Sequence, residues 1–231
     1  MLLALSSTLV GSLPTGTFSI SPVNVLLAHG QTSTSVNVAN AREAPLVIQV
    51  QIFRWTQDGD QDVLTPTSDV ILSPPMATIP IGGEQTFRLL MRPSSVAEEN
   101  KERHYRILVA EIPAAGGSPG QLSVAIRASL PMIVTPIQPD RAILAWSAAH
   151  GPDNTVVVTV SNTGLAYDKI IALTAQMPDG ETVTASQAGT NPYVLPGSKR
   201  QWTLDRTATS GTLTLNITTP TGQQNMSLTI D

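Results

Sequence analysis

Histidine is the first residue to examine for metal binding or acid–base chemistry, because its imidazole titrates near neutral pH. His29, His104 and His150 lie far apart in the sequence, and none has a second histidine at HxH or HxxxH spacing. Zinc sites commonly take two ligands from such spacings, and cysteine, the other frequent zinc ligand, is absent. We therefore predict no metal site and expect all three histidines in loops or on the surface.

An acidic run, TQDGDQD, places Asp58, Asp60 and Asp62 at alternate positions and is the one candidate for a calcium loop. An EF-hand loop needs its glycine at the sixth position and a bidentate glutamate at the twelfth. Here the glycine comes too early and no glutamate stands at the twelfth position. Asp-Gly is a strong hairpin signal, so we interpret Asp58-Gly59 as a turn between two strands.

The sequence also offers no catalytic nucleophile. Serines are plentiful, but no GxSxG elbow occurs and no Ser/His/Asp grouping can be recognised. The absence of cysteine excludes thiol catalysis, thiolate metal sites and disulfides. We predict a protein that is not an enzyme, needs no cofactor and has no small-molecule substrate.

The composition indicates an all-β chain. Of 231 residues, 13% are charged and the formal net charge is −4, so the basic surface that nucleic acid requires is missing. Eighteen prolines and sixteen glycines accompany many short alternating runs of Val, Ile, Leu and Thr. Such runs favour strands, and proline and glycine favour the turns between them.

The most informative element is the segment 122–135, LSVAIRASLPMIVT. All seven even-numbered residues are apolar and several odd positions are polar, which is the period-two pattern of a strand. At about 3.3 Å per residue it would span roughly 46 Å, well beyond a typical strand. Pro131 lacks an N–H and belongs at an edge, a strand start or a bulge. Either this edge strand completes another protein's sheet, or it is a core strand that continues into a linker and the next domain.

Strand candidates recur on both sides of a proline-rich segment, Thr135–Asp140, at spacings typical of β-sandwiches. We take this segment as the linker and predict two β-sandwich domains, at 17–136 and 140–231. The strands expected in the first domain are Phe18–Val25, Ser33–Val38, Leu46–Trp55, Gln85–Met91, Tyr105–Ile112 and 122–135. Those expected in the second are Ala142–Trp146, Val156–Val160, Lys169–Ala175, Glu181–Thr184, Gln201–Leu204, Leu213–Ile217 and Met226–Ile230. We expect the three tryptophans, Trp55, Trp146 and Trp202, in or beside the two cores.

The N-terminal residues 1–16 require a separate interpretation. Met1–Val10 (MLLALSSTLV) is short and apolar, which is typical of a secretory signal, although the basic n-region is missing. We interpret residues 1–16 as a signal-peptide remnant or leader, with mature protein beginning between Gly11 and Phe18. The alternative is a disordered or strand-forming leader. No other segment is long enough to cross a membrane.

Several motifs occur together in order: WTQDG at 55–59, SPP at 73–75, YR at 105–106, EIP at 111–113 and SLP at 129–131. In this order and spacing the sequence resembles the periplasmic pilus-assembly chaperones of the PapD-like family, and looks most like their archaic chaperone–usher branch. VVVTVSNTG at 156–164 and YVLPG at 193–197 resemble the second domain of these proteins. The resemblance implies an all-β fold of two immunoglobulin-like β-sandwich domains joined at an angle.

The function implied by the resemblance is that of a periplasmic chaperone for pilin subunits. Such a chaperone stabilises a subunit by donor-strand complementation and delivers it to an outer-membrane usher. Its strand before the domain linker supplies the strand that the subunit lacks. Carried over by position, the donor residues are Leu122, Val124 and Ile126, continued by Ala128 and Leu130. Alternatively these side chains pack inside their own domain; an exposed donor strand would also allow the free protein to self-associate.

The resemblance further implies basic residues that hold the subunit's terminal carboxylate. The basic pair of the better-known branches falls near Asn24 and Pro131 here, so it is absent. The archaic branch implies Arg106 of the Tyr-Arg pair, whose guanidinium fork suits a carboxylate. Arg127 and Arg88 are weaker candidates. Alternatively, Arg106 is a strand arginine that covers apolar neighbours with its stem.

Two other classes of function stay open at the level of sequence. A structural or adhesive β-sandwich of a surface fibre would use the long strand to polymerise, but such subunits usually have one domain and a free N-terminal donor peptide. A carbohydrate-binding or enzymatic sandwich needs an aromatic platform or a carboxylate pair. The chain has three each of Trp, Tyr and Phe, and they do not cluster in the sequence.

Overall fold

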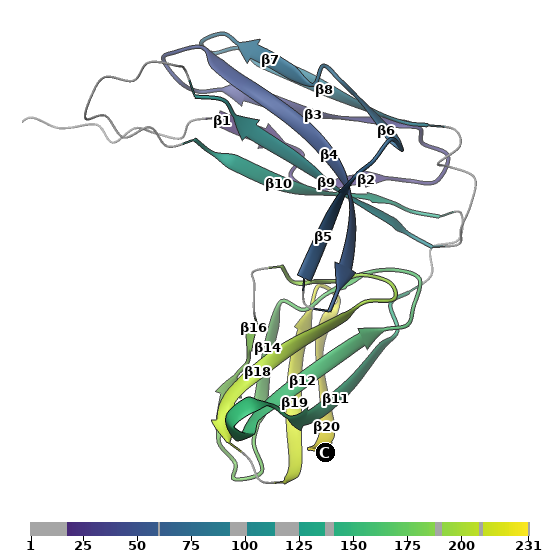
Figure 1. The fold of residues 1–231 in the computed structure, drawn as a ribbon, viewed down its shortest axis with the longest axis vertical. Coiled ribbons are helices and arrows are strands. Elements are labelled where there is room, and N and C mark those ends of the chain that lie inside the picture. Colours follow the sequence, from purple (N-terminus) through teal and green to yellow (C-terminus); the bar gives the residue numbers. More distant parts are fainter. Residues whose placement is uncertain are drawn as a thin grey trace, which may run out of the picture.

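The structure, a computed structural model, describes residues 18–59, 61–92, 101–113, 125–136, 141–187, 191–207 and 210–230. In these residues the only helical element is the short 3-10 turn η2 (Pro152–Asn154), and none is long and apolar enough to span a membrane. Figure 1 shows two domains built of strands that meet at an angle. The predicted all-β architecture is therefore confirmed.

The first domain is built from two sheets, with strand orders β1-β3-β8-β6 and β2-β10-β9-β4-β5, and β7 also pairs with β4. Its strands are β1 (Phe18–Ser21), β2 (Val25–Leu27), β3 (Ser33–Asn40), β4 (Leu46–Asp58), β5 (Gln61–Pro66), β6 (Val70–Ser73), β7 (Met76–Ile79), β8 (Glu84–Met91), β9 (Arg103–Glu111) and β10 (Arg127–Val134).

The second domain has one large sheet, of order β15-β14-β19-β20-β11-β12-β18-β16, and a small sheet of β13 and β17. Its strands are β11 (Leu144–His150), β12 (Thr155–Asn162), β13 (Asp168–Lys169), β14 (Ala172–Gln176), β15 (Thr182–Thr184), β16 (Ser186–Gln187), β17 (Tyr193–Val194), β18 (Lys199–Thr207), β19 (Gly211–Thr219) and β20 (Gly222–Ile230). The predicted leader, 1–16, lies outside the described residues, as does 137–140 of the predicted linker.

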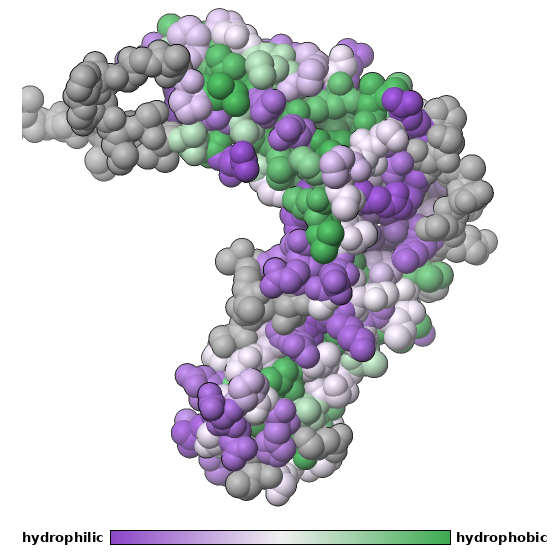
Figure 2. Space-filling model, in the orientation of Figure 1, coloured by the Kyte–Doolittle hydropathy of each residue, from purple (hydrophilic) through white to green (hydrophobic). Residues whose placement is uncertain are grey.

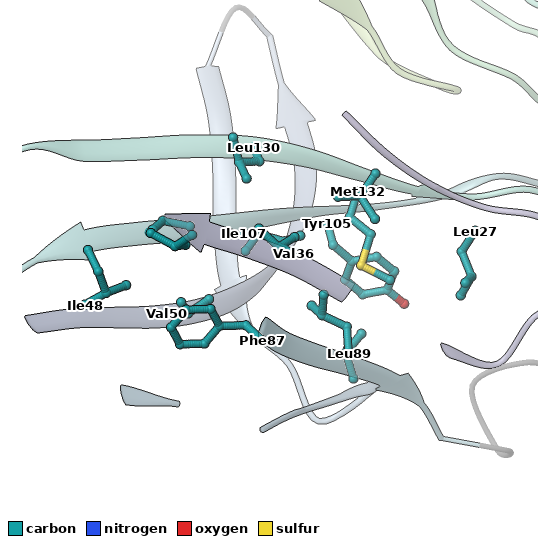
Figure 3. Packing of buried hydrophobic residues seen from close by; sticks show 14 of the residues in the cluster. Leu27, Val36, Ile48, Val50, Phe87, Leu89, Tyr105, Ile107, Leu130 and Met132 are labelled. Carbon is teal, nitrogen blue, oxygen red and sulfur yellow. The ribbon is translucent and has the colours of Figure 1, made fainter. Parts of the chain in front are cut away.

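The core of the first domain lies between its two sheets, where alternate side chains of each strand meet. On β9 the inward residues are Tyr105, Ile107 and Val109, and on β10 they are Leu130, Met132 and Val134. They pack with residues of β3, β4 and β8 such as those labelled in Figure 3. Burial of each such side chain stabilises the fold by roughly 1.5–3 kcal/mol. The even-numbered face of β10, in its second half, therefore belongs to the domain's own core.

Every predicted strand overlaps an observed one, whereas five observed strands were not predicted: β5, β6, β7, β16 and β17. These strands are short or lack an alternating apolar pattern. In β5 all six side chains are exposed or half-buried, so no hydrophobic period marks it in the sequence. Its place is set instead by pairing with the end of β4.

The hairpin of β4 and β5 projects from the first domain and reaches the second (Figure 1). Asp58 pairs with Gln61, and the intervening Gly59 has φ 55°, a left-handed conformation that glycine adopts at low cost. The predicted Asp58-Gly59 turn is confirmed, while Asp60 lies outside the described residues.

Candidate functional site

The edge of β10 is the part of the first domain that could accept another strand. On one side β10 pairs with β9 along its whole length, from Arg127 to Val134. On the other side β2 pairs with it in parallel, but only at Met132, Ile133 and Val134. Among the described strands none pairs with the outer edge of residues 127–131.

The backbone groups on this open edge follow from the register. The Glu111 N–H donates to the Ile126 carbonyl at 2.9 Å, so the even-numbered residues bond to β9. The N–H and C=O groups of Arg127 and Ser129 consequently point to the open edge. Pro131 is the next residue whose backbone nitrogen faces the open edge. Because proline has no N–H, no donor is left unpaired at this position. This edge therefore offers hydrogen-bonding groups to an additional strand over a short, defined length.

The predicted donor row passes from the domain core to the surface along this strand. Leu130 is buried in the first core, Ala128 is half-buried against it, and Ile126 is 39% exposed. Leu122 and Val124 lie outside the described residues. The described apolar row is thus anchored in the core at one end and accessible at the other.

An ion pair fixes the start of this strand. Arg42 holds the Glu111 carboxylate with two hydrogen bonds, of 2.6 and 3.1 Å. The same carboxylate accepts the Ile126 N–H at 3.4 Å. Glu111 is buried, and a bidentate arginine stabilises such a carboxylate well. The backbone at Ile126 is therefore held in place although its side chain is exposed.

Arg106, the predicted carboxylate anchor, lies where the open edge of β10 ends. It is the register partner of Pro131 on β10 and of Phe53 on β4. Its guanidinium carbon lies 3.7 Å from the ring centroid of Trp55 and 5.5 Å from that of Tyr193, in the second domain. Burial lowers the pKa of Arg106, and the nearby Asp62 carboxylate opposes this effect. In the described residues no carboxylate lies within 4.0 Å of this guanidinium.

The other two candidate arginines lie elsewhere. Arg127 is exposed at the start of β10. Its register partner on β9 is Ala110, which lies several residues from Arg106 along β9. Arg88 is exposed on β8, in the other sheet, next to Ser35 and Ser73. The structure does not bring these two side chains together with Arg106.

The joint between the domains has its own apolar cluster, formed by Trp55, Ile133, Tyr193 and Leu195, with Tyr167 beside it. Trp202 lies in the core of the second domain and Trp146 packs against that core, as expected for both. Trp55 differs from the expectation, because it is buried between the domains and not beside either core. The sequence marks the segment containing Tyr193 but not this contact, which joins residues of two domains.

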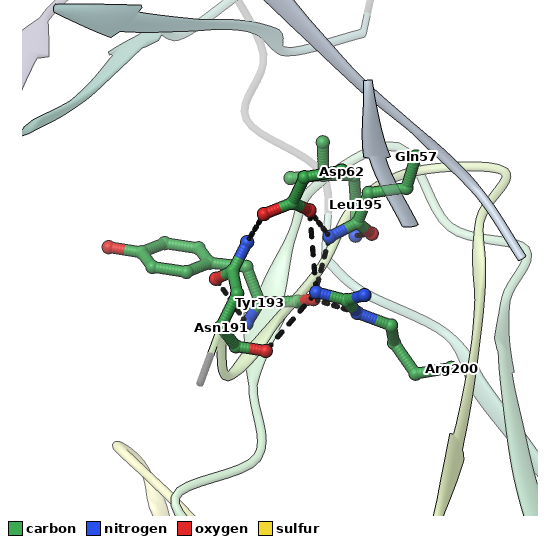
Figure 4. Close-up of polar contacts among 6 residues, drawn as sticks. All are labelled: Gln57, Asp62, Asn191, Tyr193, Leu195 and Arg200. Atoms are coloured by element: carbon green, nitrogen blue, oxygen red, sulfur yellow. Dashed lines mark hydrogen bonds and ion pairs between the residues drawn. The ribbon is translucent and has the colours of Figure 1, made fainter. Parts of the chain in front are cut away.

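Polar contacts fasten the β4–β5 hairpin to the second domain (Figure 4). The Gln57 amide donates to the Tyr193 carbonyl and accepts the Leu195 N–H, both at 3.0 Å. Arg200, which is buried, donates to the Tyr193 carbonyl at 3.1 Å and to Asp62 at 3.4 Å. Asp62 also accepts a hydrogen bond from Asn191. The angle between the domains is therefore set by specific bonds as well as by apolar contact.

The expectation for His104 is wrong. His29 and His150 are exposed, but His104 is buried in β9 at the joint, with its Nε2 3.2 Å from a Glu102 oxygen. Glu102 also accepts the backbone N–H of Tyr167 at 2.8 Å. His104 lies on the face of β9 opposite to the core residues Tyr105, Ile107 and Val109, so the alternation gave no sign of its burial. Its ring contacts Tyr167 of the second domain, which covers it. No cluster of metal-ligating side chains occurs in the described part of the chain.

Comparison with known proteins agrees with this architecture. The sequence family described as pili and flagellar-assembly chaperone, PapD N-terminal domain, matches residues 17–140. The chain is 23% identical over 213 residues to a probable fimbrial chaperone EcpB of Klebsiella pneumoniae strain 342, covering 90% of both proteins. A second strain of that species has a similar protein with 22% identity over the same length.

Solved structures share the fold. A chain of the CsuC–CsuE chaperone–tip adhesion subunit pre-assembly complex, from archaic chaperone–usher Csu pili of Acinetobacter baumannii, has a TM-score of 0.69 at 22% identity, covering 94% of this chain and all of that one. A chain of the Salmonella enterica SafA pilin–SafB chaperone complex has a TM-score of 0.61 at 15% identity, covering 94% and 97%. The two immunoglobulin-like sandwiches and the resemblance to PapD-like proteins are thus confirmed. Since the family match extends over more than half of the sequence, the chain belongs to the pili and flagellar-assembly chaperones with a PapD N-terminal domain.

Proposed function

We propose that this protein is a periplasmic chaperone that binds pilin subunits by donor-strand complementation and delivers them to an outer-membrane usher. The open edge of β10 would hydrogen-bond to the subunit's unpaired strand. Leu122, Val124 and Ile126 would fill the subunit's apolar groove, with Ala128 at the end of the row. Leu130 would support the strand from inside its own domain.

The observation that carries this proposal is an edge that is open over a limited length and lined by an exposed apolar side chain. An unpaired edge of this kind is normally protected by charges, bulges or a covering segment. Here the described edge presents Ile126 at 39% exposure, while Glu111 holds its backbone. An added strand would hydrogen-bond to the backbone groups of this edge and would cover the Ile126 side chain.

The edge also favours one place for the end of the incoming strand. Because β2 occupies the edge from Met132 onward, an added strand must stop near Pro131, beside Arg106. Arg106 is therefore the arginine we propose as anchor for a terminal carboxylate. Arg127, nearer the other end of the edge, is the second choice.

The test is an Ile126→Asp substitution in the chaperone, expressed with an affinity tag in the cells that produce it. We expect a folded protein by circular dichroism, because this side chain is outside the closed core. We expect it to lose co-purifying subunits, identified by mass spectrometry as pilin-type sandwiches, because an unpaired carboxylate in an apolar groove costs several kcal/mol.

The matched control is Ser129→Asp, on the same strand but on its other face, where we expect capture to persist. Global unfolding of Ile126→Asp would show that Ile126 is an ordinary core residue. Undiminished capture by the folded variant would show that β10 is not the donor.

A further inference from the structure

The last strand of the second domain, β20, has one fully paired edge and one edge that is almost wholly unpaired. On one side β19 pairs with all nine of its residues. On the other side its only partner among the described strands is β11, which pairs with it at Ile230 alone. Residues 222–225 are all exposed, so no described element covers this half of the strand. Residues 222–229 therefore present an open edge.

This edge has none of the features that normally keep a strand from pairing with another chain, which are charge, proline, a bulge or short length. The nine residues of β20, GQQNMSLTI, include no charged residue and no proline. Its register with β19 continues without a shift. By contrast, the partly open edge of β18 carries Lys199 and Asp205, and the edge strands β1 and β6 have four residues each. The edge of β20 is therefore suited to strand addition.

The chemistry of this strand favours a second copy of the chain as its partner. A two-fold axis places the same residues opposite each other, so a charged strand would bring like charges together. The alternate side chains that β20 exposes are those of Gln223, Asn225, Ser227 and Thr229. Amide and hydroxyl groups both donate and accept hydrogen bonds, so each can bond to its own kind. An uncharged strand of this type is complementary to itself.

The sheet face around this edge is uncharged as well. Leu213, Leu215 and Ile217 of β19 are buried in the second core, so the residues that alternate with them face outward. Asn216 on this outer face is the register partner of Asn225. The four neighbouring strands β15, β14, β19 and β20 contain no charged residue. The sheet can therefore continue across a two-fold axis without repulsion between like charges.

We propose that two copies of this chain associate by antiparallel pairing of their β20 strands, so that the β15-β14-β19-β20 layer of one copy continues into that of the other. Pairing that uses residues 222–229 of both copies has its two-fold axis at Asn225 or Met226, in the middle of the open edge. β10 belongs to the other domain (Figure 1), so its edge stays available in such a dimer. Dimer formation and subunit binding are therefore independent of each other.

The test compares the full chain with its Asn225→Lys variant by analytical ultracentrifugation over a dilution series. We expect the unaltered chain to form a concentration-dependent dimer. Asn225→Lys should weaken this dimer at least about tenfold, because the two-fold axis brings two like charges together. Thr182→Lys, which adds the same charge on β15 three strands away, is the matched control and should leave the dimer unchanged. Both positions are exposed, so both variants should fold, as circular dichroism can verify.

A charge swap tests the two-fold register directly. Asn225→Asp should also dimerise poorly by itself. An equimolar mixture of Asn225→Asp and Asn225→Lys should form a heterodimer, because opposite charges then meet at the axis. In the unaltered chain, hydrogen exchange of the β20 amides should slow as the dimer forms, whereas exchange of the Arg127 and Ser129 amides on β10 should stay the same.

An unaltered chain that remains monomeric throughout the dilution series would overturn the dimer. A dimer that survives in Asn225→Lys and is lost in Ile126→Asp would overturn the contact through β20 and assign self-association to the edge of β10. A dimer that survives in both variants would overturn pairing through β20 as well. If the mixture of the two charged variants stays monomeric, antiparallel two-fold pairing at Asn225 is wrong.

Discussion

Arg106 places its charge against aromatic rings, with Trp55 at 3.7 Å from the guanidinium carbon. Replacing it by methionine keeps an apolar stem on that ring and removes the charge. We expect Arg106→Met to fold normally, by circular dichroism, and to retain about a tenth or less of the subunit capture, measured by quantitative co-purification. Normal capture would instead assign the anchoring role to Arg127, which Arg127→Met would then test.

Tyr105, the neighbour of Arg106, points into the core and donates its hydroxyl to Asp69 at 2.9 Å. Burial, together with this hydrogen bond, raises its pKa from 10.0 to about 12. A raised pKa means that folding favours the neutral phenol. The contribution to stability is therefore constant below about pH 10 and is lost as the pH rises to about 12.

Absorbance titration of the folded protein should accordingly show a phenol that ionises near pH 12, and Tyr105→Phe should remove it. The same variant should be less stable by about 1 kcal/mol at pH 7, in urea denaturation, because the buried hydrogen bond is lost. Ionisation of all tyrosines near pH 10 would contradict this account.

At the scale of elements, the β4–β5 hairpin connects the two domains. β4 is the longest strand of the first domain, and residues before its turn contact both the joint cluster and the second domain. The far end of the same strand lies in the first core, at Ile48 and Val50. One continuous strand thus links the core to the joint.

Removal of the Gln57 amide should loosen this connection without unfolding either domain. In Gln57→Ala the Leu195 N–H loses its acceptor, so its hydrogen exchange should accelerate, and small-angle X-ray scattering should show a broader distribution of shapes. We expect the contact between the two domains to be weakened by about 1–3 kcal/mol, because the Leu195 N–H is left without its hydrogen-bond acceptor. Gln51→Ala, an exposed position on the same strand, should change neither measurement. Unaltered exchange at Leu195 would mean that the apolar cluster alone holds the joint.

At the scale of the whole molecule, two separate cores are joined by a small apolar cluster and a few polar bonds. Figure 2 shows the resulting bent molecule, hollowed on the side where the domains face each other, with apolar side chains gathered over the first domain. The bend places the second domain beside the end of β10, where Ile133 packs in the same cluster as Tyr193 and Leu195.

Separate cores predict separate responses to core mutations. Leu213 is fully buried in the second core, so Leu213→Ala should destabilise that domain by about 2–5 kcal/mol. Hydrogen exchange should accelerate in β12, β18 and β19, while β3, β8 and β9 stay protected. Leu89→Ala, in the first core, should give the reverse pattern. Uniform acceleration in either variant would show that the two domains unfold as one unit.

Much of this organisation could be predicted from local patterns. Alternation of apolar residues predicts most of the larger strands, and Asp58-Gly59 predicts the hairpin turn. These features depend on near neighbours in the chain: side chains alternate in a strand, and glycine tolerates a left-handed turn. The short strand β5 and the burial of His104 and Trp55 could not be predicted in the same way, because they depend on pairing or on the other domain.

The sequence by itself determined the all-β class, the apolar face of β10 and the family motifs, because each is written in residue types at fixed spacings. Only the tertiary structure decided which residues of that face are exposed and which are buried in the domain's own core. Leu130 is buried in its own core, Ile126 is exposed, and β2 closes the edge at Met132. The tertiary structure likewise brought Lys169 to the ring that contacts Arg106. Strand pairing and domain packing join residues far apart in the chain, and no local pattern encodes those distances.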